Sequence, residues 1–260
     1  FGVRYYPKLV AAAPFTPAGG QRLLVHPTAQ RGVVRAALVA AMVRYAEDER
    51  ASSIHVLFCT AEEQTLLGGQ GFYPRLGMQF HWRNRRPEAY RGFDDCLGAL
   101  RSRSRKQARK ERAAAAAHGL RLAVVEGPDL RPEDWVSLEA FYRANVDKHD
   151  GMAYLTPAFF DEIRARLSHR VVASLAFDGE RAVAGAFNFE RGKCLYGRYW
   201  GAEATFDSLH FELCYHRLIE RAIERGLDRL EAGAGGEHKL KRGFDPALTR
   251  SAHFIREPGL

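Results

Sequence analysis

The strongest constraint on the fold of this chain is an internal repeat. Residues 71–82 (GFYPRLGMQFHW) and residues 243–254 (GFDPALTRSAHF) share five residues at the same spacing. In both copies the repeat follows a long helical pattern, an apolar strand and a short helix, so two related domains in tandem are indicated. The matching pairs are Gly71 and Gly243, Phe72 and Phe244, Pro74 and Pro246, Leu76 and Leu248, and His81 and His253.

We therefore expect residues 1–93 to be the C-terminal part of a first domain and residues 94–260 to be a complete second domain. The first copy lacks the opening strands of the second, and the sequence begins with Phe1. Both observations lead us to expect a fragment whose true N-terminus is missing. The recurrence of His81 and His253 at one place in both copies favours a structural role for them.

Hydrophobic periodicity predicts a mixed α/β sheet rather than a doubly wound one. We expect one long helix from Asp94 to Gly119, carrying the most basic segment of the chain. The second copy then predicts strand, helix, helix, three strands, helix, strand, helix and strand. These elements fall at 120–127, 131–149, 156–168, 170–177, 182–189, 193–200, 208–226, 227–233, 237–244 and 251–257. In the first copy we expect strands at 8–15, 22–26, 53–59 and 78–84 and helices at 31–50 and 61–70.

Composition excludes several classes of protein. With 46% hydrophobic and 27% charged residues the chain has ample material for a globular core. It shows no apolar run of the roughly 18 residues that a membrane span needs, and no secretory leader. The histidines lack metal-ligand spacing, so no metal site is expected. The cysteines stand singly, which favours reduced thiols in a cytoplasmic protein; they are Cys59, Cys96, Cys194 and Cys214.

The net charge of +8 favours an anionic partner. The excess is concentrated in residues 101–112, RSRSRKQARKER, which hold seven basic residues against one glutamate. This segment predicts a solvated helix face or an anion-binding surface, and the residues leave both readings open. The sequence contains no aromatic RNA-binding motif or zinc finger that would support sequence-specific recognition of nucleic acid, and we expect no DNA partner.

The two copies differ most between the apolar strand and the following short helix. The first copy has FCTAEEQTLLGGQ, whereas the second has LEAGAGGEHKLKR, with more small residues and more ionisable ones. Glycine costs backbone entropy, so close approach of a ligand would explain its use there. The second copy is therefore the expected place of the functional site.

These segments resemble a known family. The strand order is that of the GNAT acyltransferase fold, and the tandem copies with the basic helix are similar to Fem aminoacyl transferases. The closest likeness is to FemAB-like N-acyltransferases linked to peptidoglycan biosynthesis or recognition. Three pieces carry it, and together they cover most of residues 94–260: FYRANVDKHDGMAYLTPAFF, LYGRYWGAEATFDSLHFELCYHRLIERAIERGL and EAGAGGEHKLKRGFDPALTRSAHF.

The resemblance implies transfer of an acyl or aminoacyl group to an amine acceptor such as a peptidoglycan precursor. The second copy has WGAEATFDSLHFE where acetyl-CoA-binding GNAT domains carry a glycine-rich pyrophosphate loop, and the first has only Gln30, Arg31 and Gly32. Fem-type enzymes lack that loop and use aminoacyl-tRNA. The donor is therefore either an acyl-CoA such as acetyl-CoA or an aminoacyl-tRNA. The alternative is a non-catalytic module that binds RNA or a cell-wall precursor.

Acyl transfer needs a base for the amine and donors for the developing oxyanion. Glu231, at the end of a strand, is a candidate base or a member of a structural ion pair. His238 is a candidate base or substrate ligand. Lys239 and Lys241 would hold a phosphate or carboxylate, or be ordinary surface lysines.

The expected substrate-binding residues come from the preceding strand and helix. Tyr196, Arg198 and Trp200 alternate along one strand, so we expect them to share a face that suits stacking and anion binding; the alternative is a packed face with Arg198 paired to an acid. His210 and Glu212 open the next helix, where Glu212 is a substrate ligand or a capping-box acid after Ser208. Three further candidates close a helix: Asn145, Asp147 and His149.

Overall fold

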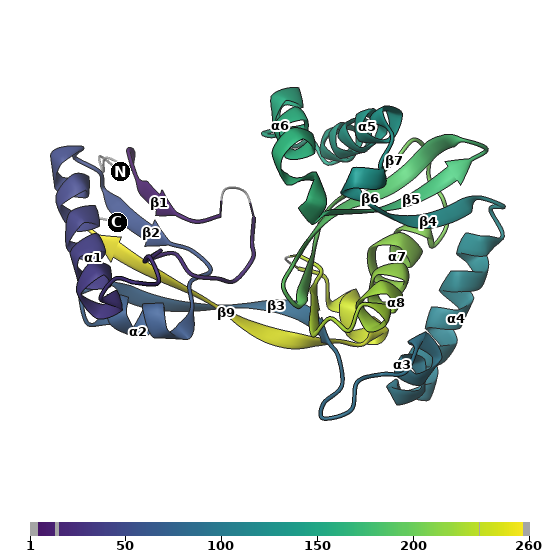
Figure 1. Ribbon diagram of the computed structural model, residues 1–260, viewed down its shortest axis with the longest axis horizontal. Helices are drawn as coiled ribbons and strands as arrows, with labels where there is room; N and C mark the ends of the chain where they lie inside the picture. The colour runs from purple at the N-terminus through teal and green to yellow at the C-terminus, as the bar shows by residue number, and fades with distance from the viewer. Residues whose placement is uncertain (1–4, 14–15, 234, 257–260) are drawn as a thin grey trace. The chain divides into compact units, whose positions relative to one another are not determined.

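A computed structural model describes residues 5–13, 16–233 and 235–256. The chain divides into two compact units. Unit 1 comprises the residues up to Gln79 together with those from Ala247 onward, and unit 2 comprises Phe80–Pro246. Two long strands, β3 (Tyr73–Arg83) and β9 (Phe244–Ile255), each run from one unit into the other (Figure 1).

Unit 1 is a small sheet with helices packed on it. Besides parts of β3 and β9, its elements are β1 (Leu9–Ala11), α1 (Arg31–Asp48), β2 (Ser53–Val56) and α2 (Ala61–Gly68). β1 runs parallel to β2, and β2 runs antiparallel to the end of β9. Alternate side chains of β2, Ile54 and Val56, are buried in one apolar core with Leu67 of α2. The sheet therefore has one apolar face and one polar face.

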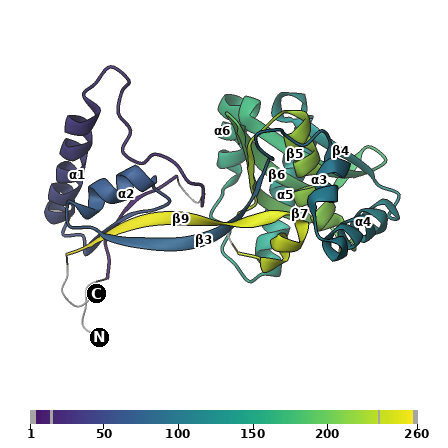
Figure 2. The ribbon, with the colours of Figure 1, turned by 90° about the horizontal axis from the view of Figure 1, so that it is seen from below.

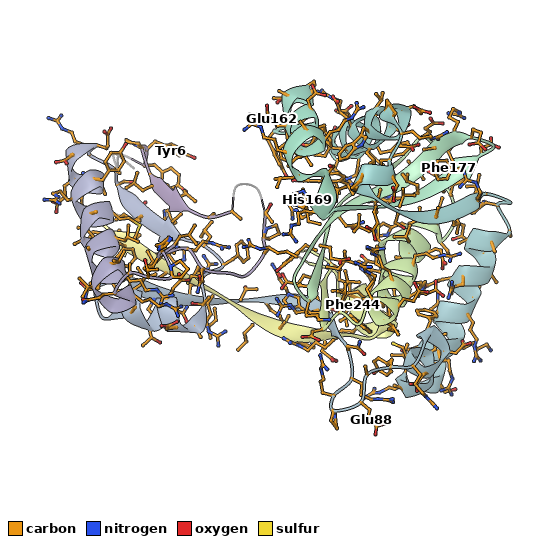
Figure 3. All side chains as sticks on the ribbon, in the orientation of Figure 1. Tyr6, Glu88, Glu162, His169, Phe177 and Phe244 are labelled. Carbon is orange, nitrogen blue, oxygen red and sulfur yellow. The ribbon has the colours of Figure 1, made fainter. Side chains whose placement is uncertain are left out.

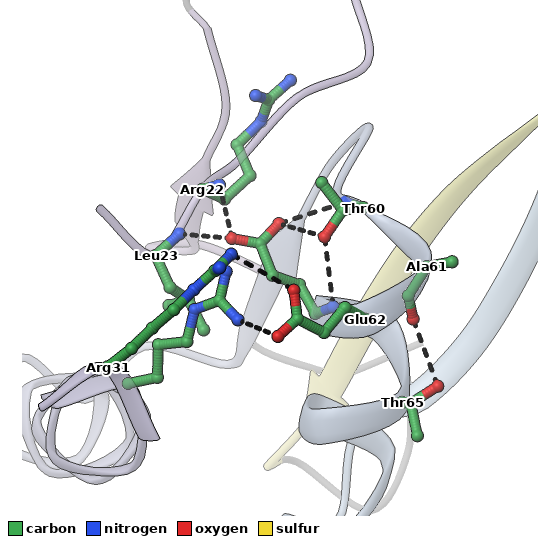
Figure 4. Close-up of polar contacts among 9 residues, drawn as sticks. Arg22, Leu23, Arg31, Thr60, Ala61, Glu62 and Thr65 are labelled. Carbon is green, nitrogen blue, oxygen red and sulfur yellow. Dashed lines mark hydrogen bonds and ion pairs between the residues drawn. The ribbon is translucent and has the colours of Figure 1, made fainter. Parts of the chain in front are cut away.

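The strand predicted at 22–26 does not form. The backbone N–H groups of Arg22 and Leu23 donate instead to one carboxylate oxygen of Glu63, each at 2.8 Å. The other oxygen of Glu63 accepts from Thr60 and closes a capping box at the start of α2 (Figure 4). Hydrophobic periodicity cannot predict hydrogen bonds from these backbone N–H groups to a side chain about 40 positions away in the sequence.

Unit 2 is a mixed sheet in the order β3-β8-β7-β6-β5-β4, in which only β7 and β8 are parallel neighbours among the described pairs. The predicted order of elements after residue 119 and the mixed α/β fold class are confirmed. The elements are α3 (Phe93–Ala99), α4 (Ser102–Ala116), β4 (Arg121–Glu126), α5 (Pro132–Lys148), α6 (Pro157–Leu167), β5 (Val171–Asp178), β6 (Arg181–Arg191), β7 (Cys194–Ala202), α7 (Leu209–Phe211), a π-helical turn (Glu212–His216), α8 (Arg217–Glu224), β8 (Arg229–Glu231) and a 3₁₀ helix (Glu237–Arg242).

Helices cover both faces of the unit 2 sheet (Figure 1). On one face, Trp135 and Phe141 of α5 pack with Phe187 of β6. On the other face, the aromatic ring of Phe244, the first residue of β9, packs edge-on against Tyr215 with ring centroids 5.4 Å apart (Figure 3). Burial on both faces explains why β5, β6 and β7 read as nearly continuous apolar runs.

The single long helix predicted from Asp94 to Gly119 is wrong. Leu100 and Arg101 adopt extended backbone conformations between α3 and α4, which are two separate helices (Figure 2). Leu100 packs against the same apolar core that buries Leu97 of α3. The free energy gained by packing Leu100 against this core outweighs the preference of the local sequence for one continuous helix.

The ends of the two repeat copies pair with strands of the opposite copy. His81 of β3 lies opposite Glu231 of β8 in unit 2, whereas His253 of β9 lies opposite His55 of β2 in unit 1. The end of the last strand of each repeat copy therefore belongs to the unit that is built mainly from the other copy. The units accordingly do not follow one cut of the sequence at residue 93, and the origin of the copies by duplication stays a prediction.

The four cysteines are free thiols, of which Cys214 is half-buried and the others are buried. Among the helices that the structure describes, none combines the length and the apolar character needed to cross a bilayer.

Candidate active site

Three of the residues predicted to bind substrate, Arg198, Trp200 and His210, lie around the point where β7 and β8 part. These parallel strands pair only over Cys194–Tyr196 and Arg229–Glu231. Beyond this point β7 continues along β6 to Ala202, whereas β8 ends and the glycine-rich turn begins, of which Ala232, Gly233, Gly235 and Gly236 are described. The carboxyl ends of parallel strands that separate in this way are the usual place for a ligand in an α/β sheet.

A β-bulge in β7 lies at the same point. Phe187 of β6 pairs with Tyr199, but the next residue, Asn188, pairs with Gly197. Arg198 is therefore the extra residue of the bulge. Bulges of this kind bend a strand and redirect a side chain, and they are common beside functional sites.

The bulge overturns the expectation that Tyr196, Arg198 and Trp200 share a face. Tyr196 lies opposite Phe189, which packs in the core on the α5 side of the sheet. Trp200 instead packs against His210 of α7 on the other side, with ring centroids 5.3 Å apart. One inserted residue inverts every side chain that follows it, so strict alternation does not hold across the bulge.

Two pockets share a wall at the bulge. The larger one, of about 730 Å³, lies between the C-terminal end of α5 and the end of β7. Its lining includes Asn145, Lys148 and His149 of the α5 end together with Glu203 and Phe206 beyond β7. Two of the three candidates predicted at the end of α5 therefore reach this pocket, and Asp147 is not among its lining residues.

The smaller pocket, of about 80 Å³, lies at the opening between β7 and β8. Gly197 and Ala232 contribute from the two strand ends, and Cys214 and Tyr215 contribute from the π-helical turn. The wall common to both pockets consists of Arg198, Tyr199, Trp200 and His210. A group bound in one pocket is therefore next to a group bound in the other.

Arg198 and Tyr199 form a polar contact in this wall. The guanidinium of Arg198 donates to the hydroxyl of Tyr199 at 3.1 Å and lies 4.9 Å from the centre of its ring. Burial raises the pKa of Tyr199 to about 12, so its hydroxyl stays protonated at neutral pH. The wall thus presents a cation and a hydroxyl to any bound group.

His210 is the aromatic corner of the wall. Its ring packs against Trp200 and also against Tyr215, with centroids 5.3 and 5.4 Å away. Burial, followed by the electrostatic influence of His238, Arg242 and Lys239, lowers the pKa of His210 to about 4. It is therefore neutral at physiological pH, which suits substrate contact better than proton removal.

Tyr215 is a site residue that the sequence did not reveal. Its hydroxyl lies 3.1 Å from Nε2 of His238, and its ring lines the small pocket. The π-helical turn brings His210 and Tyr215, five positions apart, onto one face of the helix. Such a turn has no recognisable periodicity, so the sequence offered no signal for this pair.

His238 is exposed and reaches the small pocket through Tyr215. Its ring also packs against Phe211 with centroids 5.9 Å apart. Burial of part of the ring and the nearby charges of Arg242 and Lys239 lower the pKa of His238. A neutral imidazole that contacts a tyrosine hydroxyl is able to accept a proton through it.

Lys239 and Lys241 occupy different environments. Lys239 is 3% exposed, and its ammonium donates to the backbone oxygens of Gly233 and Gly235 at 3.0 and 2.7 Å. Burial lowers the pKa of Lys239 to about 8. Lys239 thus ties the glycine-rich turn together, whereas Lys241 is exposed and available to a ligand.

Glu231 is held in a buried ion pair. Its carboxylate contacts Nε of Arg229 at 2.8 Å, and His81 approaches it to 4.0 Å. Burial lowers the pKa of His81 to about 4, so this histidine is neutral despite the nearby carboxylate, which Arg229 already balances. Glu231 is not among the lining residues of either pocket. The geometry favours the structural reading of Glu231.

Glu212 also faces inward. It is 2% exposed and pairs with Arg112 of α4 at 3.2 Å and with Arg217 at 3.1 Å. The capping-box alternative is wrong, because Ser208 adopts a left-handed conformation and its hydroxyl donates to Asp207. Glu212 therefore joins the helix to α4 rather than lining a pocket.

No group of three or more His, Cys, Asp or Glu side chains within the described ranges is placed to hold a metal ion. The polar and aromatic side chains that line the small pocket or contact its lining include Arg198, Tyr199, His210, Tyr215 and His238.

Comparisons with known proteins agree with this architecture. The C-terminal DUF2156 domain of an Agrobacterium fabrum protein superposes with a TM-score of 0.61 at 13% identity, covering 86% of this chain and 73% of that one. FemX superposes with 0.57 at 12% identity, covering 86% and 77%. L-PGS from Bacillus licheniformis superposes with 0.58 at 11% identity, covering 84% and 72%. Identities this low establish the fold and no more.

No curated protein matches the sequence. A family model does match, and it spans residues 1–260. The mixed sheet, the opening between β7 and β8 and this match over the whole chain lead to one assignment: the protein belongs to the FemAB-like family of peptidoglycan biosynthesis and recognition.

Proposed function

We propose that this protein is a transferase that moves an acyl or aminoacyl group onto the amine of a cell-wall precursor in the cytoplasm. The observation that carries the proposal is the pair of pockets that share the wall of Arg198, Tyr199, Trp200 and His210. Transfer between two bound substrates needs two adjoining compartments, and positioning alone supplies much of the rate.

The chemistry follows from the groups at that wall. The acceptor amine attacks the acyl carbonyl, and the bond to the leaving sulfur or oxygen of the donor breaks. Tyr215 passes the proton lost by the amine to His238, while the leaving group takes a proton from solvent or from the same relay. Burial raises the pKa of Tyr215, so its hydroxyl stays protonated and hands its own hydrogen to His238 as it takes the proton of the amine.

The surface of α4 favours an aminoacyl-tRNA donor. Arg103, Lys106 and Lys110 are exposed on one face of the helix and pair with no carboxylate of the described residues. The first turn of α4 contains no acidic residue, so its cations oppose the helix dipole. This unbalanced charge is unfavourable for an isolated helix and is compensated when a polyanion binds.

The donor is tested by thermal melting with free CoA, acetyl-CoA and a pool of aminoacyl-tRNA at two salt concentrations. We expect stabilisation by charged tRNA that weakens at higher salt, of roughly 2.7 kcal/mol at a hundredfold excess over Kd. A shift with CoA compounds instead would assign the donor to acyl-CoA.

The tRNA surface is tested with the triple variant Arg103→Gln, Lys106→Gln and Lys110→Gln. Removing three phosphate contacts lowers the salt slope of binding by about 2 to 3. The matched control removes the same charge from exposed arginines with no ion pair to a described carboxylate, by Arg164→Gln, Arg170→Gln and Arg191→Gln. Equal loss of binding in both triples would show that α4 is not the docking surface.

Catalysis is separated from binding with Tyr215→Phe and His238→Gln. We expect each to lower single-turnover transfer about 100-fold without changing donor affinity. The exposed His169→Gln serves as control. Binding without any transfer by the unmodified protein would favour the alternative, a binding module for RNA or a cell-wall precursor.

A further inference from the structure

A buried charge cluster connects α4 to the glycine-rich turn. Glu111 of α4 is 1% exposed and accepts hydrogen bonds from Arg242 at 2.6 and 3.0 Å, with one bond to each carboxylate oxygen. It also accepts from Gln107 at 2.9 Å and contacts Nε2 of His216 at 3.0 Å. Although burial alone would raise it, the hydrogen bonds from His216, Gln107 and Arg242 lower the pKa of Glu111 to about 2.

Arg242 connects the buried Glu111 to His238. Its Nη1 donates to the backbone oxygen of His238 at 2.7 Å. The guanidinium also lies over the ring of Phe211, 3.6 Å from its centre. Since the ring of His238 packs on Phe211 and meets the hydroxyl of Tyr215, Arg242 fixes both the peptide and the packing surface of His238.

Stability does not explain the cluster well. Burying an arginine and a glutamate costs several kcal/mol in desolvation, and an apolar pair of similar volume is often equally stable. Without Arg242, the backbone oxygen of His238 loses its hydrogen bond from a buried side chain, and the exposed ring is left with its contacts with Tyr215 and Phe211. The cluster therefore suits a positioning role.

We propose that Glu111 and Arg242 are positioning residues that hold His238 in line with Tyr215. Glu111 orients the guanidinium of Arg242 from the buried side of α4, and Arg242 holds the peptide of His238. The consequence for turnover rests on the proposed function, but the positioning itself is measurable without substrate.

The first test uses hydrogen exchange of the amides in residues 235–243 and an NMR titration of the His238 ring. We expect Glu111→Gln and Arg242→Met to speed exchange in the turn at least 10-fold. Arg242→Met also raises the pKa of His238, because a nearby positive charge is removed. Arg112→Met is the matched control, since Arg112 neighbours Glu111 but pairs with Glu212 and Glu220. Unchanged exchange and an unchanged His238 titration would overturn the proposal.

The double variant Glu111→Met with Arg242→Met separates positioning from folding. An apolar pair restores the melting temperature, yet the turn should still exchange as fast as in Arg242→Met. Recovery of slow exchange along with stability would overturn the positioning role.

The second test measures transfer. We expect both single variants to lower kcat 10- to 100-fold while KM for the donor changes less than 3-fold. Fast exchange in the variants of a protein that transfers nothing would leave positioning intact and reject the proposed function. A normal kcat in a variant with fast exchange would show that the positioning of His238 by Glu111 and Arg242 is not important for catalysis.

Discussion

Nδ1 of His55 lies 2.8 Å from Nδ1 of His253, at the register pair that joins β2 to β9 in unit 1. Ser53 and Ser251 contact the remaining Nε2 atoms at 2.9 and 2.8 Å. A single hydrogen between the two Nδ1 atoms satisfies both rings when both are neutral. Protonating both rings places two donors face to face, so the contact is lost when both histidines are charged.

This pair makes the stability of the protein depend on pH. Burial lowers the pKa of both rings, followed for His55 by the charges of His253 and Lys8 and for His253 by that of Arg75. The unfolded chain therefore binds more protons than the folded one as pH falls below about 6.5, and stability is lost from there downward. We expect His253→Gln to have a shallower loss of melting temperature than the unmodified protein between pH 7.5 and 5.0. A slope as steep as that of the exposed control His169→Gln would contradict this account.

Gly201 marks the closest approach of α5 to β7. A Cβ added there would lie 1.9 Å from the backbone oxygen of Phe141. We expect Gly201→Ala to destabilise the protein by about 3 kcal/mol or more, because backbone must move to admit the methyl group. Gly98 in α3 meets nothing within 4 Å, so Gly98→Ala should stabilise by about 0.5 kcal/mol. Urea denaturation measures the stability of both variants. Equal unfolding midpoints would contradict the close approach of α5 to Gly201.

Lys239 and Lys241 provide a matched pair for separating structure from binding. Replacing Lys239 by Met removes hydrogen bonds to Gly233 and Gly235 and should cost about 2 kcal/mol. Replacing the exposed Lys241 by Met should leave the melting temperature unchanged and weaken donor binding. Thermal melting with and without donor measures both effects. The reverse result would show that the turn does not depend on Lys239.

Glu212 should matter for folding rather than for ligand binding. Glu212→Gln leaves Arg112 and Arg217 without their buried counter-charge, and we expect a loss of about 3 kcal/mol. Glu224→Gln, at an exposed position of the same helix, is the control and should change stability by less than about 0.5 kcal/mol. If Glu212→Gln unfolds like the control but loses substrate, the role as a ligand predicted from the sequence would be supported instead.

Several features of the site were predictable because they are local. The small residues and ionisable groups that follow β8 indicated the functional turn, and His238 and Lys241 remain exposed there. The expected cluster of Tyr196, Arg198 and Trp200 was placed in the correct strand but not on the correct face. The bulge at Arg198 depends on pairing with β6, which a single strand does not encode.

By itself, the sequence determined the kinds and order of elements after residue 119, the repeat and the family resemblance. These depend on periodicity and motifs within short segments, which the chain carries wherever it folds. Only the tertiary structure decided which strands the copies exchange and which charged side chains pair internally. Glu111 meets Arg242 across 131 positions, and no local pattern specifies such a partner. Glu231, Glu212 and Lys239 are buried and make internal polar contacts. Arg198 and Tyr215 line the small pocket, and His238 contacts Tyr215.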